Sequence, residues 1–450
     1  MKIIIHRGTH QIGGCATEIA TQNTRIIIDM GEELSLDQTF VSAPLDIPGV
    51  TDNDGHCDAV LFTHYHGDHT GQLSLLHSRN TPIYLGKLTQ KILRRTTEHA
   101  IQNYENYFVR QPDEYGIRAN KNARDQQSLV FLETARTFAT ATPLTIGDFR
   151  ITPFVTEHSA IDSYMFLIEA EGKRVLHTGD FRLSGFSSAM LIQTLRNCIG
   201  HVDVVITEGT TLYDAMHPKD EDCYDPAFLP APQAETTHLD KPMTEKELQD
   251  IVINLQEEYQ YIFIMMPSTA LDRVCAIAKT KPQGGYFVID SYQKSLLDIV
   301  EEHYPPQDTF HRDFKAFVIN RTVLNNNEFM EKMRNAKIVA AVRNTSLFNR
   351  FIQTICNTEE RKKKSIFLYA MWDGYRRAYG NTINDFLALG GTGAQLHTSG
   401  HATPEAIKTL LDITTPDVVI PIHTEHPEML KTYYPEKSTI ILNDKEVFTL

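Results

Sequence analysis

The stretch Thr63-His64-Tyr65-His66-Gly67-Asp68-His69-Thr70-Gly71 places four side chains that commonly bind metals within six residues. It directly follows the strand-like run Ala59–Thr63. Imidazole and carboxylate groups at this density suit a borderline divalent cation such as zinc, and manganese and iron are also compatible. A segment of nine residues cannot wrap one ion with all four groups. We therefore expect His64 and His66 to bind one ion and Asp68 and His69 a second.

The composition is that of an ordinary globular protein, with 41% hydrophobic and 22% charged residues in a chain of 450. Because one hydrophobic core rarely extends over so long a chain, we expect two domains. No run approaches the roughly 20 apolar residues that span a bilayer. The start of the chain, Met1–Gly8, reads as a strand and lacks the features of a signal peptide. We therefore predict a cytoplasmic protein without membrane association.

Cysteine usage and net charge exclude some classes of protein. The six cysteines are scattered and form no Cys-x-x-Cys pair, which argues against a disulfide framework or a zinc ribbon. The net charge of −14 argues against a general nucleic-acid coat protein. It does not exclude a nuclease, because divalent ions add about two positive charges each at a site.

The first part of the chain, up to about residue 210, consists mainly of short strand-like runs separated by turn residues. Polar residues follow four of these runs: Asp29, His158, Asp180 and Glu208. One such residue is usually a cap or a turn residue, but four of them around the histidine motif indicate a site. The expected strands are Lys2–His6, Arg25–Asp29, Ala59–Thr63, Pro82–Leu85, Leu129–Leu132, Arg150–Val155, Ser163–Glu169, Arg174–His177 and Asp203–Thr207.

The middle part, residues 213–391, has a different pattern. A proline-rich acidic segment at 217–243 reads as a loop, and Thr244-Glu245-Lys246-Glu247 then predicts a capping box at the start of a helix. Strand and helix patterns alternate from Tyr261 onward, which predicts a parallel sheet covered by helices. No glycine-rich phosphate loop appears, so this is not an evident nucleotide-cofactor domain.

The first pattern resumes in residues 392–450. His401 lies in a turn of small residues, just before a helix start at Thr403-Pro404-Glu405. His423 follows the strand-like run Asp417–Ile422. The sequence thus predicts one domain formed by residues 1–212 and 392–450, interrupted by an inserted domain at 213–391.

Taken together, these motifs resemble the metallo-β-lactamase superfamily, and in particular its β-CASP branch of RNA-processing nucleases. The resemblance is greatest to bacterial ribonuclease J, in His158-Ser159-x-x-Asp162-Ser163, His177-Thr178-Gly179-Asp180-Phe181 and His397-x-Ser399-Gly400-His401-Ala402. The aspartate usual in ribonuclease J is replaced here by Glu208. The resemblance implies an α/β fold, in which an αββα sandwich of two sheets between helices is interrupted by the inserted β-CASP domain.

The resemblance also implies roles for the site residues. One ion would be bound by His64, His66 and His158, and a second by Asp68, His69 and His423, with Asp180 bridging the two. Asp29 would orient a ligand histidine without binding metal itself. The catalytic residues implied are Asp68, His401 and Glu208. His401 would stabilise charge or protonate the leaving oxygen, or else only bind substrate, and Glu208 would hold its ring.

The sequence identifies candidate phosphate-binding residues less clearly than the metal ligands. Thr269 and Arg273, at a strand-to-helix junction, approximate a serine–arginine pair that the resemblance places at a 5′-phosphate pocket. A helix cap and a surface arginine would look the same in sequence. Ser399 and His397 are two further candidates.

The leading hypothesis is a ribonuclease that hydrolyses phosphodiester bonds of single-stranded RNA through a hydroxide activated by two divalent ions, zinc or else manganese. Endonuclease and 5′-to-3′ exonuclease action both stay open. A hydrolase of small molecules or esters fits the acidic charge better, and a DNA nuclease is disfavoured by His423. A non-catalytic relative is disfavoured because every expected ligand is present. The chain shows no ribonuclease J-type C-terminal domain, so any homo-oligomer is expected to form without one.

Overall fold

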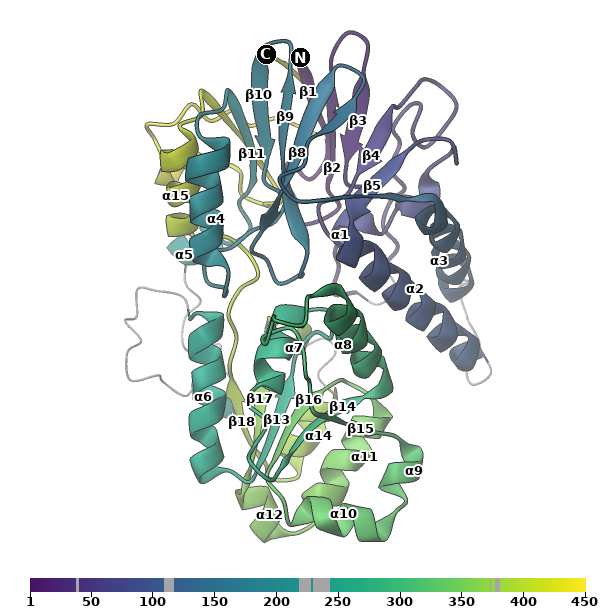
Figure 1. Ribbon diagram of the computed structural model, residues 1–450, viewed down its shortest axis with the longest axis vertical. Coiled ribbons are helices and arrows are strands. Elements are labelled where there is room, and N and C mark those ends of the chain that lie inside the picture. The colour runs from purple at the N-terminus through teal and green to yellow at the C-terminus, as the bar shows by residue number, and fades with distance from the viewer. Residues whose placement is uncertain (38–39, 109–116, 218–227, 230–242, 373, 377–380) are drawn as a thin grey trace. The chain divides into compact units, whose positions relative to one another are not determined.

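The computed structural model describes residues 1–37, 40–108, 117–217, 228–229, 243–372, 374–376 and 381–450. It divides into two compact units (Figure 1). The first contains Met1–Leu183, Ser187–Pro218 and Gly400–Leu450, and the second contains Ser184–Phe186 and Lys219–Ser399. The division therefore falls later than the predicted boundaries at 212 and 391. The strand Thr392–Gln395 pairs with a strand of the second unit, so the second unit extends to Ser399.

The first unit contains a seven-stranded sheet in the order β20-β1-β2-β3-β4-β5-β6. β1 pairs with β2 and β20 in antiparallel fashion, whereas β3, β4, β5 and β6 run parallel to one another. The strand β2 has no counterpart among the predicted strands. The strands are β1 (Lys2–Arg7), β2 (Ala16–Ala20), β3 (Arg25–Ile28), β4 (Ala59–Leu61), β5 (Ile83–Gly86), β6 (Arg136–Phe138) and β20 (Val447–Thr449).

The second sheet of this unit has six strands in the order β19-β11-β10-β9-β8-β7. β10, β11 and β19 are parallel neighbours, and β7, β8, β9 and β10 are joined by antiparallel pairings. The strands are β7 (Leu144–Ile146), β8 (Phe149–Thr156), β9 (Ser163–Ala170), β10 (Lys173–His177), β11 (Val204–Glu208) and β19 (Val418–Ile422).

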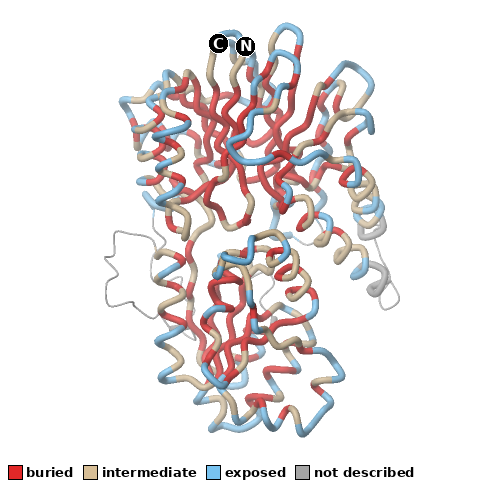
Figure 2. Tube along the Cα trace, viewed as in Figure 1, coloured by how far each residue is buried: buried red, intermediate tan, exposed pale blue. Residues whose placement is uncertain are grey.

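Alternating side chains of β8, β9, β10, β11 and β19 are divided between two cores. Figure 2 shows that the strands of this unit are largely buried. In β9, Tyr164, Phe166 and Ile168 join the core shared with the first sheet, whereas Met165 and Leu167 pack against helices on the other face. The helices of this unit are α1 (Gly67–Thr70), α2 (Lys87–Phe108), α3 (Ile117–Thr134), α4 (Ser188–Thr194), α5 (Leu212–Met216), α15 (Pro404–Thr414) and α16 (Glu428–Tyr433), with short turns η1 (Leu73–Leu75) and η2 (Leu195–Ile199).

One predicted strand of this unit is wrong. Leu129–Leu132 lies inside α3, where Phe131 and Leu132 are buried. Residues 117–128, which precede this apolar run, contain no glycine or proline that would end the helix.

The second unit is built around a seven-stranded sheet in the order β12-β18-β17-β13-β16-β14-β15, in which every described neighbouring pair is parallel. The predicted capping box is confirmed, because Thr244 and Glu247 exchange hydrogen bonds at the start of α6. The strands are β12 (Phe228–Leu229), β13 (Tyr261–Met265), β14 (Tyr286–Asp290), β15 (Ala316–Ile319), β16 (Ile338–Val342), β17 (Ser365–Tyr369) and β18 (Thr392–Gln395). The helices are α6 (Glu245–Glu258), α7 (Leu271–Ala278), α8 (Ser291–His303), α9 (Arg321–Leu324), α10 (Asn327–Arg334), α11 (Ser346–Ile355), α12 (Glu359–Lys363) and α14 (Asn381–Ala388).

The fold is thus the predicted α/β arrangement, with two sheets face to face in one unit and a parallel sheet with helices in the other. Most of the proline-rich segment 217–243 lies outside the described residues. Among the helices that the structure describes, none is both long and apolar enough to cross a membrane.

Candidate metal centre and catalytic histidine

The candidate site lies where several strands of the first unit end. Because β3 and β4 are parallel, and β10, β11 and β19 are parallel, the loops that follow them emerge at a common edge of each sheet. These loops carry Asp29, the histidine motif, Asp180, the end residue Glu208 and His423. The sequence-predicted residues at strand ends are therefore brought together by sheet topology.

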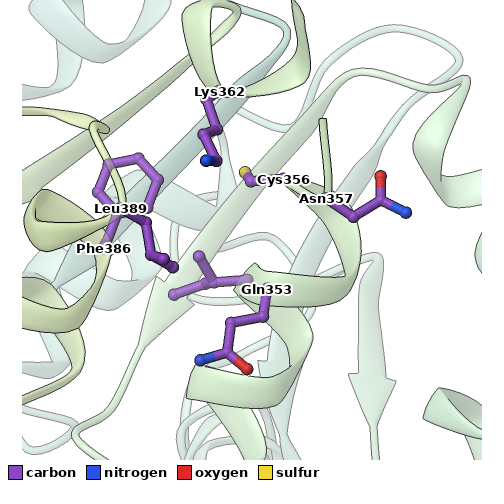
Figure 3. Close-up of a pocket in the computed structure, with 7 residues that line it drawn as sticks. Gln353, Cys356, Asn357, Lys362, Phe386 and Leu389 are labelled. Carbon is purple, nitrogen blue, oxygen red and sulfur yellow. The ribbon is translucent and has the colours of Figure 1, made fainter. Parts of the chain in front are cut away.

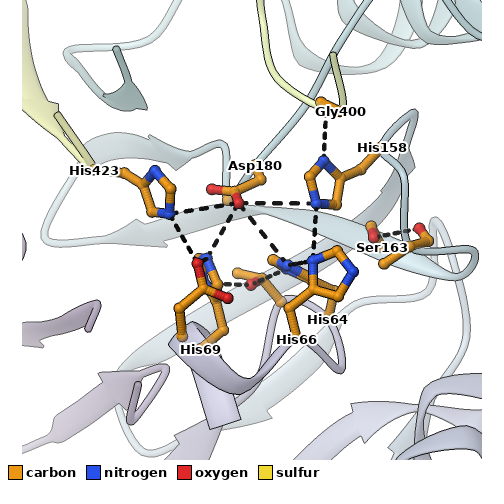
Figure 4. A network of polar contacts seen from close by, with 12 residues as sticks. His64, His66, His69, His158, Ser163, Asp180, Gly400 and His423 are labelled. Carbon is orange, nitrogen blue, oxygen red and sulfur yellow. Dashed lines mark hydrogen bonds and ion pairs between the residues drawn. The ribbon is translucent and has the colours of Figure 1, made fainter. Parts of the chain in front are cut away.

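A first group consists of the three imidazoles of His64, His66 and His158 (Figure 4). His66 Nδ1 lies 3.2 Å from His64 Nε2 and 3.2 Å from His158 Nε2. Burial lowers the pKa of His66 to about 4 and lowers the pKa of His64 and His158 well below the usual value. Three neutral rings with converging nitrogens form a suitable half-shell for a cation.

A second group consists of Asp68, His69, Asp180 and His423. His423 Nε2 lies 3.2 Å from Asp68 Oδ2, and His69 Nε2 lies 3.2 Å from Asp180 Oδ2. Burial disfavours the charged form of His69, but the carboxylates of Asp180 and Asp29 outweigh burial and raise its pKa well above the usual value. These carboxylates thus create a negative potential at this group.

A single oxygen, Asp180 Oδ2, lies between the two groups (Figure 4). It is 3.9 Å from His64 Nε2 and 3.8 Å from His158 Nε2 on one side. On the other side it is 3.2 Å from His69 Nε2 and 3.7 Å from His423 Nε2. This is the position that a bridging carboxylate would occupy.

Hydrogen bonds to the outer ring nitrogens orient the histidines. Asp29, which has a φ of 65°, accepts hydrogen bonds from Thr63 N and Thr63 Oγ1, both at 2.8 Å, and from His69 Nδ1 at 2.7 Å. Because the Thr63 hydroxyl donates to Asp29, it accepts from His64 Nδ1 at 3.0 Å. His158 Nδ1 donates to Gly400 O at 2.6 Å. Each of these contacts leaves the Nε2 lone pair directed into the cluster.

Thr210 performs the same task for His423, and sequence reasoning missed it. Its hydroxyl lies 2.8 Å from His423 Nδ1 and donates to His423 O at 3.1 Å. His423 itself has a φ of 53°. The only signal in the sequence was that Thr210 lies two residues after Glu208. Thr63 and Gly400 were likewise quoted within motifs but were not recognised as supports for the ligands.

His401 lies beside the cluster and is held by Glu208. His401 Nδ1 donates to Glu208 Oε2 at 3.0 Å, and Glu208 Oε1 accepts from the amides of Phe181 and Ala402. Burial disfavours the charged His401 ring, but Glu208 and Asp180 outweigh burial and raise its pKa to about 9. The contact with Glu208 thus fixes the orientation of the His401 ring through Nδ1.

A buried ion pair ties together the loops that carry His158 and Asp180. Arg182 donates to Glu157 Oε1 through Nη2 at 3.1 Å, and each side chain is 1% exposed. Ser187 N donates to the other oxygen, Glu157 Oε2, at 2.8 Å. Glu157 precedes His158 and Arg182 follows Asp180 by two residues, so the pair fixes the spacing of two predicted ligands.

The residues present fit the divalent metal ions that this fold implies. His69 Nε2 and Asp180 Oδ2 are buried without a hydrogen-bond partner, although they lie 3.2 Å apart. Buried polar atoms are rarely left unsatisfied, and here both are potential metal donors within the same cluster. The donor set of imidazoles and carboxylates suits zinc, with manganese as an alternative.

The structure corrects the prediction for Arg273. Its side chain is 3% exposed and donates to Glu245 through Nε and Nη2, to Ala370 O at 2.7 Å and to Thr398 O at 2.8 Å. A guanidinium with these partners is a buried structural group, not a free phosphate binder. Thr269, His397 and Ser399 also lie in the second unit. Their roles stay predictions.

The second unit also has a pocket of about 310 Å³, between α11 and α14 (Figure 3). None of its lining residues is a predicted site residue, so we place the candidate site at the histidine cluster of the first unit. The pocket is lined by Ile352, Gln353, Cys356, Asn357, Lys362, Phe386 and Leu389.

Comparisons with known proteins agree with this geometry. Residues 24–246 match a family described as a beta-lactamase superfamily domain. Ribonuclease J of Helicobacter pylori is 24% identical over 192 residues, which cover 41% of this chain and 23% of the relative. Probable RNase MJ4 of Methanocaldococcus jannaschii is 23% identical over 194 residues, covering 41% and 39%. Ribonuclease J 1 of Streptococcus pyogenes is 27% identical over 179 residues, covering 39% and 27%.

A crystal structure of a protein of unknown function from Enterococcus faecalis V583 superposes with a TM-score of 0.72 at 18% identity, covering 100% of this chain and 99% of that one. It therefore shares the whole fold. The matches to the ribonucleases span less than half of each relative, and they are consistent with a relation to the β-CASP ribonucleases. The chain thus contains a metallo-β-lactamase domain, the fold of metal-dependent hydrolases, and is a distant homologue of the ribonuclease J and RNase MJ4 proteins.

Proposed function

We propose that the protein is a metal-dependent ribonuclease that hydrolyses phosphodiester bonds of single-stranded RNA. The observation that carries the proposal is the convergence of two donor groups on Asp180 Oδ2, with the His401–Glu208 pair beside them. The names of the homologues support RNA as the substrate. The cytoplasmic location expected from the sequence belongs to the same proposal.

In this proposal, His64, His66 and His158 hold one divalent ion and Asp68, His69 and His423 hold the other, with Asp180 shared. Two such ions supply Lewis acidity, which makes water a better nucleophile at neutral pH and offsets phosphate charge. Asp29, Thr63 and Thr210 keep the ligand imidazoles in the required tautomer. Zinc is favoured by the number of imidazoles, and manganese is the alternative.

His401 acts on the substrate in this scheme. With its Nδ1 held by Glu208, the protonated ring donates from Nε2 to a phosphate oxygen or to the leaving oxygen. Glu208 is a positioning residue, because both of its oxygens are occupied by His401 and by backbone amides. Asp68 serves as a metal ligand and so as part of the catalytic centre. Thr269, His397 and Ser399 are the proposed phosphate contacts.

The test is an RNA cleavage assay in zinc and in manganese. The substrates are a 5′-monophosphorylated single-stranded RNA and a DNA of the same sequence. We expect the wild type to cut the RNA and His401→Ala and Asp68→Ala not to do so. His56→Ala is the matched control, because this imidazole lies on the surface of the same unit with 76% of its side chain exposed. The ladder of products would separate exonuclease from endonuclease action.

The acidic net charge of −14 favours a second candidate, a hydrolase of small molecules or esters. Such an enzyme would cleave a small phosphodiester or ester and leave both polynucleotides intact. Preferential cleavage of the DNA would instead indicate a DNA nuclease. Either result would overturn the ribonuclease proposal while leaving the metal centre in place.

A further inference from the structure

We propose that the thiol of Cys15 is an additional ligand of the ion held by Asp68, His69 and His423. The Sγ atom and one ring nitrogen each of His69 and His423 all lie within 4.8 Å of one another. His69 also has a buried ring nitrogen, Nε2, without a hydrogen-bond partner. The inference deepens the metal site on which the proposed function rests.

The backbone of Cys15 is fixed to the histidine motif. Its amide donates to Asp68 O at 3.1 Å, and its carbonyl accepts from Gly31 N at 2.9 Å. The residue lies immediately before β2 and is 1% exposed. The thiol therefore keeps its place relative to Asp68 and His69 as rigidly as the motif does.

Gly8 connects Cys15 to the third ligand. Gly8 O accepts a hydrogen bond from His423 N at 2.7 Å, and Gly8 has a φ of +108°. A Cβ atom at this position would lie 3.3 Å from Cys15 Sγ. A side chain at Gly8, whose carbonyl group holds the backbone of His423, would therefore crowd the Cys15 thiol.

Cys57, a second buried cysteine of the same unit, shows how a cysteine without a metal-binding role is placed. Cys57 is 4% exposed, and its thiol donates to Ala59 O at 3.3 Å. It therefore behaves as a small core residue with a weak donor. Cys15 is also buried, but its Sγ lies within 4.8 Å of a ring nitrogen of His69 and of a ring nitrogen of His423.

Binding of the ion by Cys15 would replace the thiol proton with a sulfur–metal bond, and it would change the metal preference of the site. On binding, the proton passes to solvent and one sulfur–metal bond forms. A thiolate is a softer ligand than a carboxylate or an imidazole. Cys15 would therefore bias the second ion toward zinc or cobalt and away from manganese.

The experiment is optical spectroscopy of the chain after chelation and reloading with Co²⁺, a coloured substitute for zinc. We expect a near-ultraviolet thiolate-to-cobalt charge-transfer band in the wild type and in Cys57→Ser, and no such band in Cys15→Ser. A further variant replaces the other five cysteines by serine and leaves Cys15 untouched. It should keep the band, and this result does not depend on how well Cys15→Ser folds.

A wild type that binds Co²⁺ without the band would overturn the inference, as would a band that survives in Cys15→Ser. Competition between zinc and manganese gives a second readout, in which Cys15→Ser should lose about tenfold or more in zinc affinity. Neither readout uses RNA. A protein that shows the band but cuts no RNA would contradict only the proposed function, and one that cuts RNA without the band would contradict only this inference.

Discussion

Individual residues of the candidate centre have little freedom, and Gly31 shows why. A Cβ atom on Gly31 would lie 1.7 Å from Asp68 O, because the turn after β3 presses against the motif loop. Gly67, inside the motif itself, has nothing within 4 Å of an added Cβ. The backbone at Gly31 therefore leaves no room for a side chain, whereas the backbone at Gly67 does.

We expect Gly31→Ala to destabilise the fold by at least about 1–3 kcal/mol, the usual range for overpacking, and to reduce bound metal. Gly67→Ala is the matched control and should leave both quantities nearly unchanged. Urea unfolding and elemental analysis of the purified variants would check this. Equal losses in the two variants would contradict the steric argument.

A second prediction at the level of single residues concerns Glu208 and its effect on His401. Glu208→Gln keeps the shape of the side chain but removes the charge that favours the protonated His401 ring. We expect kcat for RNA to fall about 10²-fold or more, within the range for general acid–base catalysis, with little change in KM or metal content. Glu405→Gln, an exposed residue of α15, serves as the control. A change in KM alone would assign His401 to substrate binding.

At this scale the sequence identified the candidate ligands but not the residues that orient them. His158, Asp180, Glu208 and His423 could be predicted because a polar residue at the end of a strand is visible in one dimension. Thr63 and Thr210 could not be assigned, because their role depends on which imidazole the fold brings beside them. Arg273 was misjudged because its partner Glu245 lies 28 residues away.

At the level of elements, the loops after β8 and β10 are held in register by Glu157 and Arg182. Removing one partner leaves an uncompensated buried charge, so Arg182→Met should cost about 3–5 kcal/mol of stability. The double variant Glu157→Leu with Arg182→Met should recover most of that loss. Chemical denaturation of the single and double variants would measure the coupling. Additive losses would show that the two side chains act independently.

The second unit has an ion-pair group whose stability depends on pH. His311 lies 2.8 Å from Asp308 and 3.5 Å from Asp272 of α7. Burial by itself lowers the pKa of His311, but the two carboxylates outweigh burial and raise it. The pKa of Asp308 is lowered, because hydrogen bonds from His311 outweigh its burial.

The stabilisation from His311 is complete below the unfolded pKa of histidine and is lost as the pH rises through the raised folded value. The stabilisation from Asp308 is complete above the unfolded pKa of aspartate, and it is lost as the pH falls through the lowered pKa of Asp308 in the folded state. Their joint contribution, about 1 kcal/mol, is therefore greatest between about pH 4 and 6.5. Stability curves of the wild type and His311→Gln should differ most in this window and converge above it. A constant difference up to high pH would contradict the assignment.

Elements with a clear period were predictable, and an isolated apolar run was not. Most strands and helices of the second unit were predicted because their apolar residues alternate regularly between the two periods, and the capping box also marked the start of α6. Leu129–Leu132 has no such signal, and four apolar residues fit a strand or a buried helix turn equally well.

For the whole molecule, the important feature is that the chain has two compact units with separate cores. The predicted metal ligands belong to the first unit, and the only tryptophan of the chain, Trp372, belongs to the second. Loss of metal should therefore lower the stability of the first unit and leave the stability of the second unit unchanged.

We expect a chelator to lower the unfolding transition followed by circular dichroism, because an ion present at 100 times its dissociation constant stabilises the folded state by about 2.7 kcal/mol. The transition followed by Trp372 fluorescence should stay in place. Ca²⁺-saturated chelator provides the control. Parallel shifts of both signals would show that the two units unfold as one.

The course of synthesis follows from the interruption of the first unit. β1 pairs with β20, and β11 pairs with β19. In the sequence, the residues of the second unit at 219–399 lie between the two strands of each pair. At 5–20 residues per second, a ribosome needs roughly ten to forty seconds to make residues 219–399. During that delay the nascent chain already carries most of the metal donors, but His401 and His423 do not yet exist. Under the proposed function, the site that acts on RNA is completed only after the inserted domain has been translated, so the emerging polypeptide would not cut the messenger that encodes it.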